Sequence, residues 1–461
     1  MNSDRRKPTR REFLRSSTTA AAGVTLLGTP AIRSVLGANE KIRVGFIGVG
    51  NRGTQLLRGF MAQNDAEIVA LCDVYEPYLA RRNADVGKEV VDSIGERVPK
   101  MGETFPSEVA RYKDFRRVLD RKDIDAVVIA TPDHWHAIQA IMACQAGKDV
   151  YVEKPLSVTI REGRKMVEAA AKHNRVVQVG LHRRSSDMYA ELAKGLQAGK
   201  IGKITTARSY RVSNMAPAGI GRYPDKAPPE GLDWDMWLGP RPKRAYRDNL
   251  AFYKFRWWEA YSSQVANWGV HYCDAIRWVL NEQAPVSISA HGGRFAVDDD
   301  RTIPDTMEVI FEMPSGVLIT FGQYEASGVS PFESGEIEFR GTLGNLYSGA
   351  EGGGYKIVPS PGGQFQPREP RLKPEEKPVD KGGPDLTFRH VRNFLDCVKS
   401  RQRTNCDMET GHRSTTFALL ANIALATKSR IDWDPKSERI TNNKAANKLL
   451  HYEYRKPWTL A

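Results

Sequence analysis

Two short motifs, about a hundred residues apart, carry the residue types needed for redox chemistry on a bound nucleotide. Residues 48–53 read GVGNRG and fit the pattern G-x-G-x-x-G. Residues 153–155 read EKP and follow an apolar segment that ends in Val152. A glycine loop after a strand predicts a nucleotide cradle, and a lysine at the end of a later strand can reach into it.

The glycines of the first motif have separate physical roles. The first permits a tight turn, the second lets the backbone approach a pyrophosphate, and the third lets helix and strand pack closely. The anionic phosphate then meets the N-terminus of the following helix. We therefore predict cofactor contacts from Gly48, Gly50, Asn51, Arg52 and Gly53.

Asp73 lies twenty residues after Gly53, at the end of a second apolar segment. A carboxylate at this place takes the ribose hydroxyls of the adenosine half, and it would repel a 2′-phosphate, which favours NAD over NADP. Arg52, or Arg81 and Arg82, could still admit NADP. The alternative is a solvated aspartate at a strand end.

Residues 131–136 (TPDHWH) follow a third apolar strand, so they belong beside the cofactor at the carboxyl edge of a parallel sheet. We predict cofactor contacts from Thr131, Pro132, His134 and His136. No third ligand accompanies the two histidines, so we predict no metal. Capping the next helix and lining the cleft are the roles expected for them.

Lys154 is the predicted catalytic centre, and Lys154 and Glu153 are both predicted to contact the cofactor. An ammonium that is partly desolvated beside a cationic nicotinamide has a lowered pKa. It can then polarise a substrate hydroxyl or share its proton. A surface lysine before a turn proline is the alternative, and the strand-end position favours catalysis.

Positions 267, 271 and 274 fall on one face of a predicted helix. His271 could accept the proton of a substrate hydroxyl as general acid and base, or it could be a core histidine. We predict that Asn267 joins the catalytic set. We also predict substrate contacts from Arg183, Trp258 and Asp274.

The elements that must position these residues alternate between strand and helix up to Gly180. This alternation predicts an α/β fold with a doubly wound parallel sheet. It includes a long helical crossover over 76–113. Four segments follow: a loop over 214–258 packed by its own tryptophans, antiparallel strands over 286–340, a long surface loop over 341–383, and helices near 386–400 and 409–428.

Four regions are predicted along the chain. They are a signal segment (1–38), a Rossmann dinucleotide-binding domain (39–180), an α+β substrate and oligomerisation domain with a large, mostly antiparallel open sheet (181–435), and a C-terminal tail (436–461).

The N-terminal segment has the features of an export signal. Residues 9–15 (TRREFLR) form a twin-arginine pattern, and residues 20–27 (AAAGVTLL) form an apolar run too short to span a bilayer. The twin-arginine route exports folded proteins, which suits an enzyme that loads its cofactor before export to the periplasm. A disordered basic tail is the alternative. No later stretch predicts membrane insertion.

The composition excludes several other classes of protein. The net charge of +13 is spread along 461 residues without a basic block or a nucleic-acid-binding module, so we predict no nucleic-acid partner. The five cysteines show no C-x-x-C spacing, which argues against a zinc site or a disulfide framework. Cys397 and Cys406 could pair in an oxidising compartment.

Together these motifs resemble the Gfo/Idh/MocA family of oxidoreductases, which includes glucose-fructose oxidoreductase and inositol dehydrogenases. The resemblance covers about residues 41 to 435. It rests on the glycine loop, residues 131–136 and 153–155, the helix with His271 and Asp274, and the downstream segments 390–396 (HVRNFLD) and 422–425 (NIAL).

The resemblance implies a Rossmann domain with an open antiparallel sheet, an NAD cofactor and oligomerisation through the sheet. It implies that Lys154 is the central catalytic residue, that His271 is its partner, and that Lys154-Pro155 is a cis bond. One departure stands out, because Asn267 occupies a position that is often aspartate in the family. An amide can orient a hydroxyl but cannot hold a proton.

Three functions compete at this stage. The leading one is hydride transfer between NAD and a hydroxyl of a sugar, polyol or glycoside. The second is a glycosidase that uses bound NAD for transient oxidation, which acidifies a sugar C–H and permits elimination. The third is a non-catalytic sugar-binding protein, against which Lys154 and His271 argue.

Overall fold

The structure is a computed structural model that describes residues 40–332, 335–349, 354–378 and 385–460. The predicted signal segment, residues 1–38, lies outside these ranges. The described residues belong to one compact unit. Within the described residues, no helix is long and apolar enough to cross a membrane.

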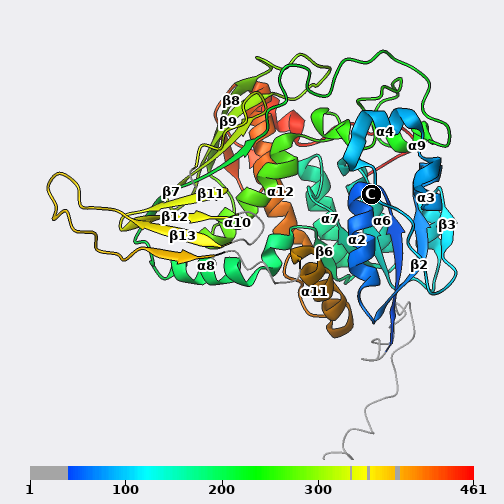
Figure 1. The fold of residues 1–461 in the computed structure, drawn as a ribbon, viewed down its shortest axis with the longest axis horizontal. Coiled ribbons are helices and arrows are strands. Elements are labelled where there is room, and N and C mark those ends of the chain that lie inside the picture. The colour runs from blue at the N-terminus through cyan, green and yellow to red at the C-terminus, as the bar shows by residue number, and fades with distance from the viewer. Residues whose placement is uncertain (1–39, 333–334, 350–353, 379–384, 461) are drawn as a thin grey trace, which may run out of the picture. The chain divides into compact units, whose positions relative to one another are not determined.

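The N-terminal part holds a six-stranded sheet in the order β3-β2-β1-β4-β5-β6, with every neighbouring pair parallel. The predicted doubly wound parallel sheet is therefore confirmed (Figure 1). Its strands are β1 (Ile42–Ile47), β2 (Ala66–Cys72), β3 (Ala110–Tyr112), β4 (Ala126–Ile129), β5 (Asp149–Val152) and β6 (Val177–Val179).

Short helices connect these strands. They are α2 (Asn51–Met61), α3 (Glu76–Ala80), α4 (Lys88–Ile94), α5 (Phe115–Asp120), α6 (His136–Gln145) and α7 (Ile160–Lys172). The prediction of one helical crossover over 76–113 is wrong. The helix α4 stops at Gly95, whose φ of +51° lies in the left-handed region, and the chain then returns as the edge strand β3.

The C-terminal part holds a ten-stranded sheet in the order β14-β13-β12-β11-β7-β10-β9-β8-β15-β16. Among the described strands, β7 and β10 form its one parallel pair, so the predicted mostly antiparallel sheet is confirmed. The strands are β7 (Ile204–Val212), β8 (Ser287–Gly293), β9 (Thr306–Glu312), β10 (Leu318–Tyr324), β11 (Ile337–Gly341), β12 (Gly344–Ser348), β13 (Tyr355–Pro359), β14 (Glu375–Lys377), β15 (Ile431–Asp434) and β16 (Arg439–Ile440).

The prediction of a surface loop over 341–383 is also wrong, because β12, β13 and β14 extend the sheet there. In β13, Tyr355 and Ile357 are buried while Lys356 and Val358 are exposed, as expected for a strand with one covered face. The alternation spans only a few residues between glycines and prolines, so the composition of the whole segment concealed it.

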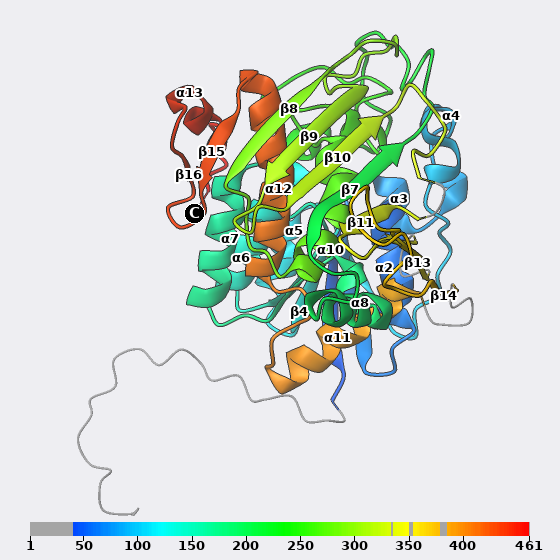
Figure 2. The same ribbon diagram turned by 90° about the vertical axis from the view of Figure 1, so that its left-hand side faces the viewer.

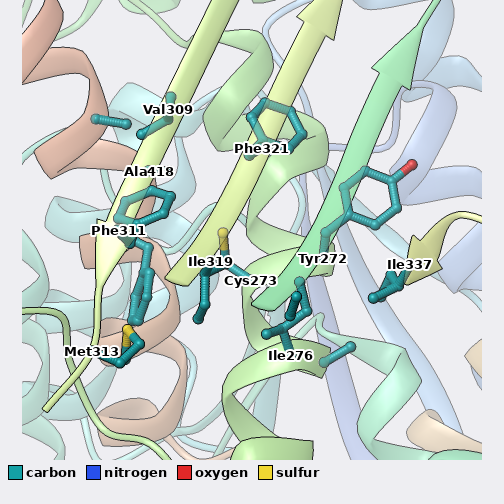
Figure 3. Packing of buried hydrophobic residues seen from close by; sticks show 14 of the residues in the cluster. Tyr272, Cys273, Ile276, Val309, Phe311, Met313, Ile319, Phe321, Ile337 and Ala418 are labelled. Carbon is teal, nitrogen blue, oxygen red and sulfur yellow. The ribbon is translucent and has the colours of Figure 1, made fainter. Parts of the chain in front are cut away.

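Three helices cover one face of this sheet. They are α8 (Asp187–Gln197), α10 (Val270–Leu280) and α12 (Met408–Thr427), and Figure 2 shows the strands in front of α10 and α12. Figure 3 shows Val309 and Phe311 from the strands beside Ala418 of α12, and Phe321 beside Tyr272 of α10, all of them buried. This shared core fixes α10 in place, and α10 carries His271 on its first turn.

The tryptophan-rich segment, residues 214–258, packs by its own aromatic rings, as predicted. Trp234 and Trp237 of the short helix α9 (Trp234–Leu238) stack with 4.8 Å between ring centres. The segment also binds the Rossmann part, which the sequence did not indicate. The backbone N–H of Asp233 donates to the carbonyl of Val74 at 2.9 Å, just beyond the end of β2.

The last part of the chain returns to the first domain. Phe394 of α11 (Leu386–Ser400) packs on Phe60 of α2 at 6.1 Å, and Trp458 packs on Trp135 at 4.7 Å. The remaining helix is α13 (Lys444–Asn447). All five cysteines are free, buried thiols, so Cys397 and Cys406 are not paired in this structure.

Gly53→Ala tests the packing of the glycine loop. A Cβ at this position would lie 2.1 Å from the carbonyl oxygen of Gly48, which is rigid backbone. We expect the free energy of unfolding to fall by about 1–3 kcal/mol, together with weaker binding of NAD. Urea denaturation and a fluorescence titration measure the two effects.

The matched control is Gly363→Ala, because nothing lies within 4 Å of a Cβ built there. It should match the parent protein in both measurements. A Gly53→Ala protein with the stability and NAD affinity of this control would contradict the packing account.

Candidate active site

A cavity of about 380 Å³ opens at the carboxyl ends of the parallel strands. Its lining includes Gly48, Asp73, Thr131 and Lys154 from the Rossmann part. His271 enters the lining from the second domain. The structure thus brings the two opening motifs and the predicted partner histidine to one place.

The glycine loop has the geometry of a phosphate cradle. Gly48 has a φ of +87°, and a Cβ there would lie 2.8 Å from the backbone of Ala130 and Thr131. The following helix α2 begins without a side-chain cap and without an acidic residue in its first turn. Its N-terminal N–H groups are therefore suited to an anion, and the loop fits the pyrophosphate of a dinucleotide.

Asp73 lines the same cavity just beyond the end of β2. Its carboxylate accepts the backbone N–H of Val49 at 2.8 Å and that of Tyr75 at 3.0 Å. Burial raises the pKa of Asp73, and these backbone donors oppose that rise. Each carboxylate oxygen retains a further lone pair, so the group can still accept a ribose hydroxyl.

The arginines considered for a 2′-phosphate are engaged with carboxylates. Arg81 is buried and pairs with Glu103 at 2.8 Å, and Arg82 pairs with Asp85 at 2.5 Å. A 2′-phosphate would have to compete with these carboxylates. The geometry therefore suits NAD better than NADP.

Lys154 joins the two domains through its amine. Nζ donates to the side-chain oxygen of Asn267 at 2.9 Å and to its backbone carbonyl at 2.8 Å. Asn267 lies in a π-helical turn, Val265–Gly269, of the kind that often occurs at functional sites. Burial is the main cause that lowers the pKa of Lys154 to about 8, and the charge of Glu153 opposes it.

Glu153 holds Arg52 at the edge of the glycine loop. The Arg52 Nε donates to the carboxylate at 2.8 Å, and the backbone N–H of Lys154 donates to it at 3.1 Å. Burial alone would raise the pKa of Glu153, but the charges of Arg52 and Lys154 lower it overall. The carboxylate therefore stays ionised and links the lysine strand to the cofactor loop. The predicted cis bond between Lys154 and Pro155 is confirmed.

Two imidazole rings stand beside Lys154. The rings of His182 and His271 are 5.3 Å apart, and both line the cavity. Burial holds the pKa of each ring well below its usual range, and the charge of Lys154 adds to the effect. Nδ1 of each ring has no hydrogen-bond partner among the described residues. Both rings are therefore neutral near pH 7.

His182 was not among the predicted site residues, although its position in the sequence indicates a place at the site. It follows β6 closely, as Lys154 follows β5, so it belongs to the same carboxyl edge. Asp133 was also missed as a lining residue. It is buried and accepts a hydrogen bond from the Ser262 hydroxyl, and burial raises its pKa.

His134 and His136 lie outside the cavity lining and act in packing instead. His134 Nε2 contacts the carbonyl oxygen of Trp237 at 2.9 Å, which anchors the tryptophan-rich segment. The two ring nitrogens of His136 lie 2.8 and 2.9 Å from the carbonyl oxygens of Pro155 and Thr131. His136 therefore braces two catalytic loops without reaching into the cavity.

The three predicted substrate contacts also lie away from the cavity lining. Arg183 pairs with Glu336 at 2.7 Å, and Asp274 pairs with Arg184 at 2.8 Å. The indole nitrogen of Trp258 donates to a backbone carbonyl at 2.7 Å. Their polar groups bind partners inside the fold, apart from the buried Nε of Arg183, and none of the three residues lines the cavity. The third loop glycine, Gly53, is likewise a packing residue.

Comparisons with known proteins agree with this arrangement. The model of an oxidoreductase family with an NAD-binding Rossmann fold matches residues 42–181. The model of the C-terminal α/β domain of the same oxidoreductase family matches residues 209–321 and 371–460.

Individual curated relatives match only part of the chain. A glycosyl hydrolase family 109 protein of Stenotrophomonas maltophilia is 36% identical over 156 residues, which cover 33% of this chain and 31% of that protein. An alpha-N-acetylgalactosaminidase of Shewanella oneidensis is 34% identical over 29% of this chain and 27% of its own length. The chain spans about a third of the length of the curated relatives it matches.

Solved structures share the fold across most of the chain. A levoglucosan dehydrogenase in complex with NADH and levoglucosan has a TM-score of 0.61 at 17% identity. The similarity covers 85% of this chain and 99% of that one.

Asn267→Asp tests the electrostatics of the amine. A carboxylate in place of the amide would favour the charged form of Lys154, so we expect its pKa to rise from about 8 toward the ordinary 10.5. The pH dependence of Lys154 modification by an amine-reactive reagent, followed by mass spectrometry, reports this value. An unchanged modification profile would show that Asn267 does not set the charge of Lys154.

Proposed function

Because the chain belongs to the Gfo/Idh/MocA family of oxidoreductases, we propose that it oxidises a hydroxyl of a sugar, polyol or glycoside with NAD. The observation that carries the proposal is the contact of Lys154 with Asn267 inside the cavity that also holds the glycine loop and His271. Dehydrogenation needs a hydride acceptor and a proton acceptor at one carbinol carbon. This cavity combines a cradle for NAD, the hydride acceptor, with Lys154 as a proton acceptor.

The bound NAD would supply the hydride acceptor, and the chain's own residues would hold it. The glycine loop and the N-terminus of α2 would bind the pyrophosphate, and Asp73 would bind the adenosine ribose. Gly180 and Thr131 would lie along the nicotinamide half, next to Lys154 in the lining. The tryptophan-rich segment contributes Met236 and Trp237 to the lining.

The proton of the hydroxyl would pass to Lys154 rather than to His271 alone. A proton acceptor works best when its pKa is near the operating pH, and the pKa of Lys154 is about 8. His271 has a pKa far below its usual range, so its neutral ring is a weak base. It would orient the hydroxyl by a hydrogen bond while the neutral amine takes the proton.

Lys154→Ala tests the catalytic assignment. We expect kcat to fall by about 10²- to 10⁴-fold, because a positioned proton acceptor contributes that much. NAD should remain bound, since the glycine loop and Asp73 are unchanged. Stopped-flow absorbance at the nicotinamide band measures the rate, and calorimetry measures the NAD affinity.

The matched control is Lys165→Ala, whose amine pairs with Glu168 on the surface of α7. It should keep the parent rate. A Lys154→Ala protein that turns over at the rate of this control, with NAD bound, would remove Lys154 from the reaction.

The cofactor itself is identified by mass spectrometry of the nucleotide released from the purified protein. A panel of sugars, polyols and glycosides is then screened for reduction of the nicotinamide. NAD without any hydride transfer across the panel would reject the oxidoreductase proposal.

A second function, an NAD-dependent glycosidase, is supported by the relatives named as a glycosyl hydrolase family 109 protein and an alpha-N-acetylgalactosaminidase. In this reaction a hydride would pass transiently from the sugar to NAD, and the neighbouring C–H would become acidic and lose its proton as the glycosidic oxygen leaves. Water would then add to the resulting double bond, and the hydride would return to the sugar. A chromogenic glycoside distinguishes the two functions. Release of the aglycone without net NADH would favour the glycosidase, and stoichiometric NADH without aglycone would favour the dehydrogenase.

We further propose that the protein is exported by the twin-arginine route to the periplasm. The support is the sequence of residues 9–15 and 20–27. Fractionation of expressing cells tests this. Full-length protein confined to the cytoplasm would reject it.

We also propose that the open face of the ten-stranded sheet forms a homo-oligomer. Ile310 of β9 and Leu318 of β10 lie on that face with 46% and 41% of their surfaces exposed. Ile310→Lys should reduce the mass measured by light scattering to that of the monomer, because it buries a charge in the interface. Val329→Lys is the control, since Val329 is 85% exposed and lies beyond β10. A monomeric parent protein would contradict this proposal.

A further inference from the structure

The charged groups that line the cavity do not balance. Arg52 pairs with Glu153 at 2.8 Å, and Lys113 pairs with Glu76 at 3.2 Å. Other cations of the lining form no ion pair with any described carboxylate; they are Arg97, Lys154 and Arg256. A guanidinium in a cavity without a counter-charge is a ready partner for an anionic ligand.

Neighbouring groups hold the guanidinium of Arg256 in one orientation. Its Nη1 donates to the carbonyl of Tyr253 at 2.9 Å. Its guanidinium carbon lies 4.2 Å from the ring centre of Tyr253 and 4.5 Å from that of Phe255. The aromatic contacts hold the planar group, yet this hydrogen bond uses one of its five N–H donors. The other donors remain available to a ligand.

Arg256 and Lys154 line the same cavity. The charge of Arg256 contributes to lowering the pKa of Lys154 and also acts on Asp133. Asp133 does not neutralise it, because that carboxylate forms no ion pair and accepts the hydroxyl of Ser262 instead. The backbone carbonyl of Arg97 accepts the side-chain N–H of Asn51 at 2.9 Å. The guanidinium carbon of Arg97 lies 5.1 Å from the ring centre of Tyr253, on which Arg256 also packs.

We propose that Arg256 binds a carboxylate of the substrate, so that the enzyme acts on sugar acids, such as aldonates or uronates, in preference to neutral sugars. This inference rests on the proposed oxidoreductase function and names its substrate class. A carboxylate accepts two parallel N–H bonds from one guanidinium, which fixes the orientation of the sugar. It also offsets the repulsion between Arg256, Lys154 and a cationic nicotinamide.

The competing role for Arg256 is a contact with the cofactor pyrophosphate. The glycine loop and the uncapped N-terminus of α2 already provide backbone donors for that group. The free donors of Arg256 therefore fit the substrate better, and measured NAD affinity separates the two roles.

Paired substrates test the inference on the holoenzyme. Glucuronate and gluconate are compared with glucose, and galacturonate with galactose, by kcat/KM and by calorimetric binding to the NADH form. We expect the acids to be favoured by about 10- to 100-fold, as a hydrogen-bonded charge pair would give. Arg256→Gln should remove this preference through a higher KM for the acids, so that the ratio of kcat/KM between acids and neutral sugars falls toward one, while the NAD affinity stays unchanged. The pKa of Lys154 should rise when the Arg256 charge is lost, so kcat for acids and neutral sugars should change together.

Two further variants sharpen the result. Arg256→Lys keeps the charge but loses the paired N–H donors, so it should retain part of the preference. Arg222→Gln is the matched control, because Arg222 is exposed and pairs with the exposed Asp298. It should behave as the parent protein.

Three other results would overturn the inference, and each can be told from the others. Equal turnover of acids and neutral sugars would reject the substrate class and leave the oxidoreductase function standing. Weaker NAD binding in Arg256→Gln, with an unchanged preference, would assign Arg256 to the cofactor. If no sugar is oxidised, the oxidoreductase proposal fails, and the calorimetric comparison of glucuronate with glucose still decides whether Arg256 binds a carboxylate.

Discussion

The site depends on one interaction between the two domains, the hydrogen bonds from the Lys154 amine to Asn267. The amine extends from the end of β5, and its acceptor comes from the π-helical turn before α10. Because an amide carries no net charge, it holds the amine in place and stabilises its positive charge less than a carboxylate would. A carboxylate at the same place would hold it equally well but would raise its pKa, so that a smaller fraction of the amine would be neutral at a given pH.

The packing of the rest of the fold keeps Lys154 within hydrogen-bonding distance of Asn267. The core beneath the ten-stranded sheet fixes α10, and the α11 helix and the chain end return to pack on the Rossmann part. Glu153 links the lysine strand to Arg52 of the glycine loop, so the amine is positioned relative to the cofactor cradle as well. The geometry of the reaction thus depends on packing at a distance from the cavity.

Local patterns in the sequence predicted one part of the site and could not predict another. The glycine loop, Asp73 and Lys154 each stand at the end of a strand, where their roles follow from short-range rules. His271 was found because helical spacing relates it to Asn267. Roles that depend on contacts between residues far apart in the chain could not be seen in the sequence. Asp274 is bound by Arg184, ninety positions away in the chain, and Arg256 lines the cavity from a short 3₁₀ helix, Lys254–Trp257.

The central claim is that a neutral Lys154 accepts the substrate proton, and the pH dependence of hydride transfer tests it most directly. Single-turnover rates of the NAD-loaded enzyme would be measured from pH 5.5 to pH 10 with a substrate from the screen. The account predicts that the rate rises with pH through an apparent pKa of about 8, which is that of Lys154. A rate that is independent of pH over this range, or that rises through a pKa near 6.5 as an ordinary histidine would give, would contradict it.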